Sequence, residues 1–388
     1  MLTHWRRVLP LIVVAALFIY EDRATIPSCK LVPAAGESAD GQKDHPDDLK
    51  VMLVSDLLLL GSDSGFWNTI FTDYYMSKFF KKSYELLKPD LLLMLGDVFA
   101  KGSQVKRSEW PNLVQQLHRL LGPFSGLPFH VTLGDREIGE CNELEETFVN
   151  WVARKFPALD SVGCGAFEIA DIGFVSLNTV ALLCGGNSKL RFSVEKLIER
   201  ESVYRQPENK QVRDVYKSTE MKLTSVDFQW RENVAMSGSG SVLLLHFPLH
   251  QTVNSRCSKT LHKNSRFSSL GSNNAGGPYD TSQSLPANVT EYIFQALRPR
   301  IVFSAHTHEF CDRTHLDGTR EVTVPAMAWG AKNDPGFVFA NFRKNGSIIS
   351  VSHCSLTGES TFLVVYISLV TLLMMCMLLA NAPNEDIS

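Results

Sequence analysis

Six acidic and imidazole side chains stand directly after apolar, strand-like runs of the chain. They are Asp56, Asp97, Asp135, His246, His306 and His308. Strand ends that meet at one edge of an α/β sheet bring such residues together. Carboxylate oxygens combined with imidazole nitrogens suit Mn²⁺, Fe or Zn²⁺. A single Asp at a strand end is usually a turn or capping residue, so it is the joint pattern that predicts a metal site.

The elements that must position these residues alternate in type through the first half of the chain. Short apolar runs rich in Val and Leu predict strands, and longer amphipathic stretches between them predict helices. Strands separated by helices indicate βαβ units with a parallel sheet. The predicted strands are 51–55, 91–95 and 129–133, and the predicted helices are 71–87, 110–121 and 143–155.

The second half of the chain changes to strands joined by turns. Turns at 171–173 and 344–346 predict two hairpins, formed by 166–170 with 173–178 and by 337–342 with 348–353. Three further strands are expected at 242–245, 300–304 and 321–324. This order predicts an α/β fold, a mixed two-sheet β-sandwich flanked by helices. The polar stretches 183–219 and 254–286 are expected to be insertions or mobile loops.

Two apolar segments divide the 388 residues into regions. The run 8–20 follows Arg6 and Arg7, so residues 1–20 predict a signal anchor or signal peptide. Residues 361–380 contain no charged side chain and are long enough for a transmembrane helix. The expected regions are therefore this N-terminal segment, a linker at 21–49, a folded domain at 50–355, the transmembrane helix and a short tail at 381–388.

The charges and cysteines indicate where the folded domain lies. The paired arginines favour a cytosolic N-terminus, which places the main domain in the lumen of the secretory pathway, at the membrane of the endoplasmic reticulum or Golgi. Asn288-Val289-Thr290 and Asn345-Gly346-Ser347 are glycosylation sequons. Seven of the eight cysteines lie between the apolar segments, and their spacing favours disulfides and buried thiols over a zinc site. A net charge of −3 without a basic stripe argues against nucleic acid as a partner.

Five segments together resemble the signature of the calcineurin-like metallophosphoesterase family, over roughly residues 49–354. The family pattern is Asp-x-His, Gly-Asp, Gly-Asn-His-Asp/Glu, a His ahead of Pro, and Gly-His-x-His. In the same order this chain has Asp56-Leu57-Leu58, Gly96-Asp97, Gly134-Asp135-Arg136-Glu137, His246-Phe247-Pro248 and Ala305-His306-Thr307-His308. The flanking apolar segments, the Phe-Pro-Leu after His246 and the run 324–329 are similar to the membrane-bound branch that removes ethanolamine phosphate from GPI-anchor glycans.

The resemblance implies a four-layer αββα fold with a two-metal phosphoesterase site. One divalent ion would be held by Asp97, Asp135, His246 and His306, and another by Asp56, Asp97 and His308, with Asp97 bridging. Mn²⁺ is the expected metal, with Fe and Zn²⁺ as alternatives and with one or two ions bound. The implied substrate or partner is a phosphodiester-bearing glycan or glycolipid at the membrane.

Four positions depart from the family pattern. Leu58 replaces a histidine that would hold the first metal, and Arg136 replaces the catalytic histidine; Asp135 stands for Asn and Ala305 for Gly. A guanidinium stays protonated, so Arg136 cannot act as a general acid. It can grip a phosphate through two parallel hydrogen bonds, so Arg136 is the candidate catalytic residue in the role of phosphate clamp.

Two functions remain open on these residues. The first is a metal-dependent phosphodiester hydrolase, slowed by the changes at Leu58 and Arg136 and acting in GPI-glycan remodelling. The second is a non-catalytic relative that binds a partner or a phosphorylated glycan through the same surface.

Overall fold

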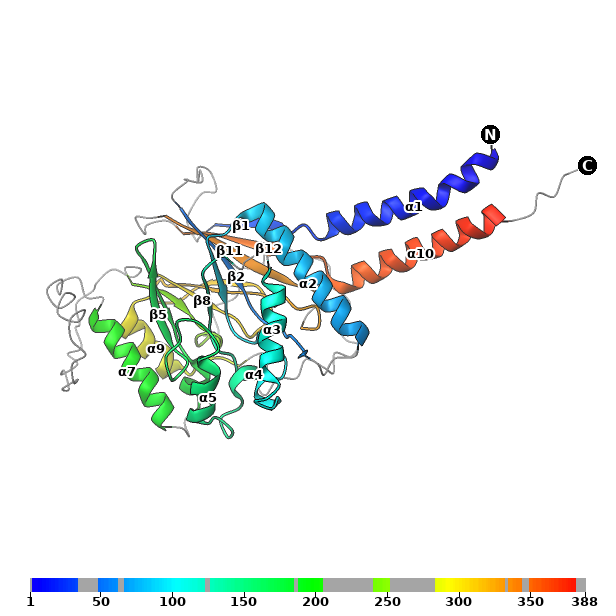
Figure 1. Ribbon diagram of the computed structural model, residues 1–388. Helices are drawn as coiled ribbons and strands as arrows, with labels where there is room; N and C mark the ends of the chain where they lie inside the picture. Colours follow the sequence, from blue (N-terminus) through cyan, green and yellow to red (C-terminus); the bar gives the residue numbers. More distant parts are fainter. Residues whose placement is uncertain are drawn as a thin grey trace, which may run out of the picture.

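Two six-stranded sheets pack face to face between helices, in a computed structural model of the protein (Figure 1). The structure describes residues 2–33, 48–61, 66–122, 126–184, 188–204, 240–251, 283–331, 334–343 and 349–381. The α/β fold class with two mixed sheets and flanking helices, expected from the sequence, is confirmed.

The first sheet has the order β1-β12-β11-β2-β3-β4. Strands β2, β3 and β4 are parallel, while β11 and β12 form an antiparallel hairpin beside β2. The bounds are β1 Ser28–Val32, β2 Leu49–Val54, β3 Leu91–Met94, β4 Phe129–Val131, β11 Gly336–Phe342 and β12 Ile349–Ser355.

The second sheet has the order β5-β6-β7-β8-β10-β9. The four strands from β6 to β10 run parallel, and β5 and β9 are antiparallel edge strands. The bounds are β5 Gly165–Ile169, β6 Ile172–Ser176, β7 Val242–Leu244, β8 Ile301–Ser304, β9 Cys311–Thr314 and β10 Arg320–Thr323.

Strand β2 shows why the strands are apolar on both faces. Val51 and Leu53 belong to the buried cluster between the two sheets, whereas Met52 and Val54 belong to the cluster under the helices. Alternate side chains of a strand point to opposite faces, so a strand covered on both sides reads as a continuous apolar run.

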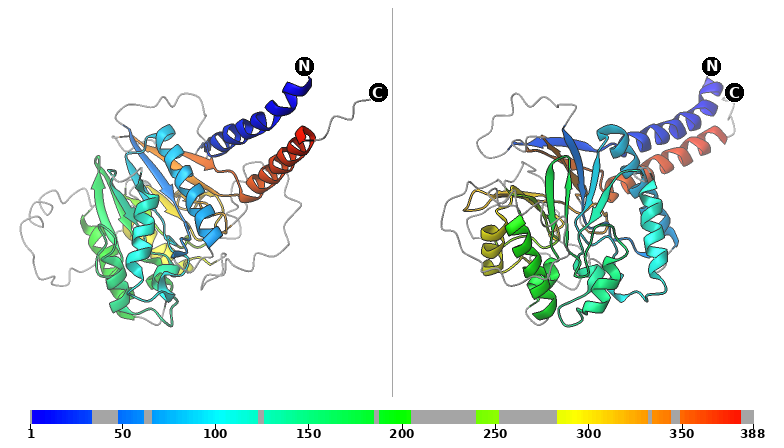
Figure 2. Two further views of the ribbon diagram at one scale, coloured as in Figure 1. Left: turned by 45° about the vertical axis from the view of Figure 1, so that its right-hand side comes forward. Right: turned by 60° about the vertical axis from the view of Figure 1, so that its left-hand side comes forward.

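Helices cover the outer faces of the sandwich. Helices α2 and α3 lie over the first sheet, and α7 and α9 lie over the second (Figures 1 and 2). The short helices α4 and α6 follow β4 and β6, and α5 follows α4. The bounds are α2 Phe66–Leu87, α3 Trp110–Leu120, α4 Asp135–Ile138, α5 Glu146–Ala153, α6 Thr179–Leu183, α7 Ser188–Tyr204 and α9 Ala287–Leu297.

The terminal helices α1 (Leu2–Ala24) and α10 (Glu359–Asn381) lie side by side and leave the sandwich in the same direction (Figures 1 and 2). Their bases are joined by a hydrogen bond from Thr357 Oγ1 to Ala24 O of 2.7 Å. Within the described residues, α10 is the one helix that is long and apolar enough to cross a membrane. Most of its large apolar side chains face outward.

Two stretches differ from the sequence-based expectation. Strand β1 lies inside the expected linker 21–49, because it pairs with β12 and is joined to it by the Cys29–Cys354 disulfide. Residues 188–204, expected within a loop, form α7, whose face of Leu190, Val194 and Leu197 is buried. That helical spacing was present in the sequence. Residues 205–219, most of 254–286, and the turn 344–346 lie outside the described residues.

Candidate metal centre

The six candidate ligands come together at the carboxyl ends of the parallel strands. Asp56, Asp97 and Asp135 follow β2, β3 and β4, which are neighbours in the first sheet. His246 follows β7, and His306 and His308 follow β8, which are neighbours in the second sheet. All six side chains are buried. The sandwich therefore brings carboxylates from one sheet to imidazoles from the other.

Four of these residues form a compact cluster. Asp97, Asp135, His246 and His306 each offer a donor atom, and these atoms all lie within 4.8 Å of one another. His246 Nε2 lies 2.9 Å from Asp135 Oδ1 and 3.5 Å from Asp97 Oδ1. His306 Nδ1 lies 3.5 Å from Asp135 Oδ1. Two carboxylates and two imidazoles at this spacing are a donor set for one divalent transition-metal ion.

The backbone around the cluster orients His246. Its Nδ1 lies 2.8 Å from the carbonyl of Leu95, which is a pure acceptor. A proton on Nδ1 therefore leaves Nε2 as the nitrogen that faces the carboxylates and that could bind a metal ion, as in metal-binding histidines generally. Gly96 makes this approach possible: a Cβ there would lie 2.4 Å from His246 Nδ1, and its φ of +87° also favours glycine.

Buried negative charge dominates the electrostatics of the cluster. Burial and the neighbouring charge of Asp135 raise the pKa of Asp97 well above its ordinary value. Burial lowers the pKa of His246, but Asp97 and Asp135 outweigh burial and raise it to about 10. Asp135 Oδ2 is buried and makes no hydrogen bond to another described residue. Since a divalent cation would satisfy this oxygen and offset the charge, these four residues fit a metal ion.

The second half of the candidate site is less complete. Asp56 is fully buried, and His308 Nε2 lies 3.4 Å from its Oδ1. The third expected member, Asp97, faces Arg136, whose Nε donates to Asp97 Oδ2 at 3.1 Å. Leu58 offers no donor atom and packs against the core cluster under the helices. Both carboxylate oxygens of Asp56 are buried and make no hydrogen bond to another described residue, so a cation could bind there. Because Leu58 supplies no ligand and Arg136 stands beside Asp97, these residues do not fit a full first metal site.

Unusual backbone conformations concentrate at these loops. Asp56, Leu58, Asp97, His306 and His308 have φ between 50° and 67°, a region that costs non-glycine residues energy. Hydrogen bonds between loops hold part of this geometry: Asp56 N donates to Gly96 O and Leu58 N donates to Asp97 O, both at 3.1 Å. Such backbone conformations persist where surrounding contacts hold them in place. They are typical of functional sites.

Glu137 is a buried positioning residue that the sequence analysis did not assign to the site. Its Oε2 accepts hydrogen bonds from Asp97 N at 3.0 Å and Gly134 N at 2.9 Å, and its Oε1 accepts from Phe99 N at 2.9 Å. It thereby joins the loops that follow β3 and β4. The acidic residue at the fourth position of the Gly-Asn-His-Asp/Glu pattern was the signal that could have identified it.

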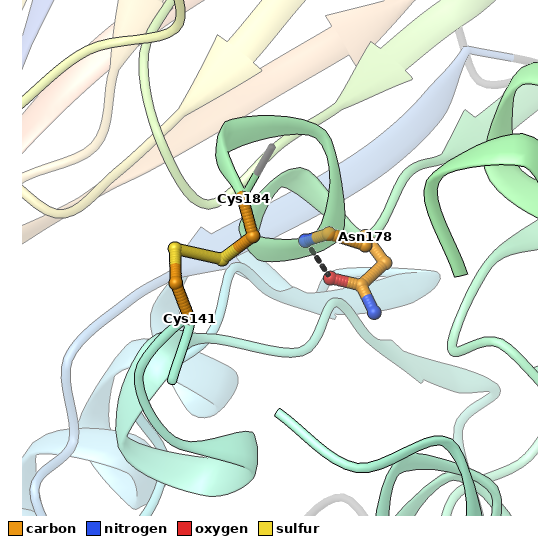
Figure 3. The surroundings of a disulfide bond; sticks show 4 residues. Cys141, Asn178 and Cys184 are labelled. Atoms are coloured by element: carbon orange, nitrogen blue, oxygen red, sulfur yellow. Dashed lines mark hydrogen bonds between the residues drawn. A yellow bond between two sulfur atoms is a disulfide. The ribbon is translucent and has the colours of Figure 1, made fainter. Parts of the chain in front are cut away.

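A disulfide near the site ties α4 to α6. Cys141, three residues beyond α4, is bonded to Cys184 at the end of α6, and Asn178 caps α6 by accepting a hydrogen bond from Ala181 N at 3.1 Å (Figure 3). Within α6, Thr179 Oγ1 accepts from Phe247 N at 3.1 Å. The segment after Arg136 and the segment after His246 are thus fixed to the same short helix.

Comparison with known proteins identifies the family. The model of the family described as "Calcineurin-like phosphoesterase" matches residues 49–310. This chain belongs to that family. The matched range contains all six candidate ligands together with Leu58 and Arg136.

Proteins named metallophosphoesterase 1 are among the relatives of this calcineurin-like phosphoesterase. The Rattus norvegicus protein is 25% identical over 348 residues, covering 89% of this chain and 81% of its own. The Drosophila melanogaster homolog is 22% identical over 320 residues, covering 80% and 76%. A solved dimetal phosphatase from Danio rerio is 11% identical, with a TM-score of 0.42, and the match covers 75% of this chain and 92% of that one. Membership of the family supports a hydrolase that uses divalent metal.

Proposed function

We propose that this protein is a phosphodiester hydrolase with a divalent metal held by Asp97, Asp135, His246 and His306. The observation that carries the proposal is the buried cluster of these four side chains, with donor atoms within 4.8 Å of one another. A bound divalent ion activates a water molecule and polarises a phosphoryl oxygen. The expected ion is Mn²⁺, with Fe and Zn²⁺ as alternatives, because the donors mix hard oxygens with borderline nitrogens.

The chain's own residues would orient the ligands and offset charge rather than transfer protons. Leu95 O directs Nε2 of His246 into the cluster, and Glu137 fixes the backbone of Asp97. Arg136 lies beside Asp97 with a permanent positive charge, which would favour a phosphate but cannot deliver a proton to a leaving oxygen. Without a general acid at this position, turnover is expected to be about 10²- to 10⁴-fold slower than with one.

The proposed substrate is a phosphodiester on a glycan or glycolipid at a membrane, with the ethanolamine phosphate of a GPI glycan as the first candidate. The resemblance of the motifs after His246 and at 324–329 to the membrane-bound branch of the family supports this choice, and proteins named metallophosphoesterase 1 are among the relatives of the chain. The apolar helix α10 supports attachment to the membrane, with α1 beside it as a second anchoring helix. Such an arrangement would hold the domain close to a lipid-linked substrate.

The proposed location is the lumenal side of the endoplasmic reticulum or Golgi membrane. The disulfides Cys29–Cys354 and Cys141–Cys184 support an oxidising compartment. The sequon residue Asn288 is exposed at the start of α9, where a glycan would face solvent.

A second function is favoured by Leu58 and Arg136 together. The first removes a metal ligand and the second replaces the catalytic histidine of the family pattern, so a protein that binds a phosphodiester without cleaving it is the alternative. It would use the same cluster and the positive charge of Arg136.

Hydrolysis by the purified full-length protein in detergent separates the two functions. With Mn²⁺, we expect slow cleavage of bis(p-nitrophenyl) phosphate that His306→Ala abolishes and His118→Ala, an exposed histidine of α3, does not change. Calorimetric binding of an ethanolamine phosphodiester without any cleavage would instead support the binding protein. Equal cleavage by the parent and His306→Ala would refute the proposed site.

A further inference from the structure

Arg136 does more than take the place of a catalytic histidine, because it makes direct hydrogen bonds to Asp97. Arg136 N and Nε donate to the two carboxylate oxygens of Asp97, at 3.2 Å to Oδ1 and 3.1 Å to Oδ2. Its Nη1 lies 3.4 Å from Ala100 O, on the loop that follows Asp97. The Arg136 side chain is 8% exposed and that of Asp97 is 1% exposed. The guanidinium is therefore a buried, fixed partner of this carboxylate.

Asp97 lies between two neighbouring groups, the imidazole of His246 and the guanidinium of Arg136. Its Oδ1 lies 3.5 Å from His246 Nε2, within the four-residue cluster, while its Oδ2 accepts from the guanidinium of Arg136. A carboxylate that bridges two metal ions would have a cation on each side. Here a permanent cation supplied by the chain stands on one of those sides.

From this arrangement we infer that the Arg136 guanidinium replaces the first metal ion, so that the protein binds one divalent ion, in the Asp97–Asp135–His246–His306 cluster. The inference rests on the proposed function for that cluster and specifies its metal content. It assigns Arg136 a role as a built-in counter-charge for Asp97, in addition to any contact with phosphate.

Leu58 and Arg136 are complementary in this arrangement. A guanidinium and a divalent ion next to the same carboxylate would repel each other, and a ligand at position 58 would favour the ion. Leucine removes that ligand, while arginine supplies the positive charge that the buried carboxylate needs. The remaining residues of the first site, Asp56 and His308, lie next to each other, with His308 Nε2 3.4 Å from Asp56 Oδ1. The two substitutions should therefore act as a unit.

Metal content and electron paramagnetic resonance of the full-length protein, loaded with Mn²⁺ in detergent and dialysed, test the inference. We expect one tightly held Mn²⁺ per chain with the spectrum of an isolated ion. Leu58→His alone should still hold one ion, because Arg136 remains beside Asp97. The double variant Leu58→His/Arg136→His should hold two ions with an exchange-coupled spectrum. Arg136→Lys, which keeps the charge, should hold one.

Two ions with a coupled spectrum in the parent, or a second ion gained by Leu58→His alone, would overturn the inference. A double variant that is folded by circular dichroism and still holds one ion would overturn it as well. If that variant fails to fold, the parent and Arg136→Lys measurements decide. Hydrolysis measured on the same samples keeps the two proposals separate. One bound ion without cleavage would refute the hydrolase function and leave this inference standing. Two bound ions with cleavage would refute this inference and leave the hydrolase function standing.

Discussion

Glu137 fixes Asp97 through the backbone: its buried Oε2 accepts a hydrogen bond from Asp97 N at 3.0 Å. The same oxygen accepts from Gly134 N at 2.9 Å, so one carboxylate sets the spacing between the loops that carry Asp97 and Asp135. This relationship predicts that Glu137 affects metal binding without touching a metal.

We expect Glu137→Gln to weaken both folding and metal affinity. The amide keeps one acceptor oxygen but presents an NH₂ donor to a backbone N–H, so at least one buried bond is lost, at a cost of about 1–3 kcal/mol. Disturbed support of ligands typically lowers metal affinity about 10- to 100-fold. Urea unfolding and Mn²⁺ titration measure the two effects. Glu140→Gln, an exposed neighbour, is the control; equal effects in both variants would rule out the positioning role.

Restoring the family residues should restore chemistry. The double variant Leu58→His/Arg136→His returns a metal ligand and a general acid to the same fold, and Asp135→Asn is a third step. We expect hydrolysis of an aryl phosphodiester with Mn²⁺ to rise at least about tenfold over the parent, a floor set by the usual size of general-acid catalysis. A parent that is already fast and a slower variant would show that Arg136 belongs to a working mechanism.

The proposed topology predicts glycosylation at the sequons. Endoglycosidase should increase the mobility of the protein expressed in cells, and replacing both Asn288 and Asn345 with Gln should abolish that change. Asn142→Gln, exposed but outside any sequon, should leave it intact. Digestion of the domain by protease added to sealed vesicles from the cytosolic side would contradict a lumenal domain.

His130 predicts loss of stability in mild acid. It is buried in β4 beside Phe167, with ring centroids 4.7 Å apart, and burial lowers its pKa to about 4. The unfolded chain, with an ordinary pKa near 6.5, binds this proton first. The full free energy of unfolding is therefore retained above about pH 6.5. As the pH falls from there toward 4, proton uptake by this histidine in the unfolded chain lowers the free energy of unfolding by roughly 3 kcal/mol in all.

Urea unfolding at pH 7.5, 6 and 5 measures this dependence. The variant His130→Leu should lose less stability between these pH values than the parent, because it has no proton to bind at this position. His118→Leu, which removes an exposed histidine, should follow the parent. If His130→Leu and the parent have parallel profiles, the buried imidazole is not the source of the acid sensitivity.

The sequence alone determined the features that depend on short-range pattern. Apolar runs ending in Asp or His marked β2, β3, β4, β7 and β8, because a strand covered on both faces must be continuously apolar and its polar residues fall at its ends. The uncharged run near the C-terminus marked α10 by length and composition. Residue type also excluded Arg136 as a proton donor, since that depends on the guanidinium and not on its surroundings.

The tertiary structure decided what depends on contacts between distant segments. Only the packing of the two sheets brings His246 within 2.9 Å of Asp135, and only the loop geometry directs the Arg136 side chain to Asp97 rather than to solvent. Strand β1 is held by pairing and a disulfide with a partner 325 residues away, which no local pattern records. A side chain's type is written in the sequence, but its direction and partner are set by the backbone of segments that meet only after folding.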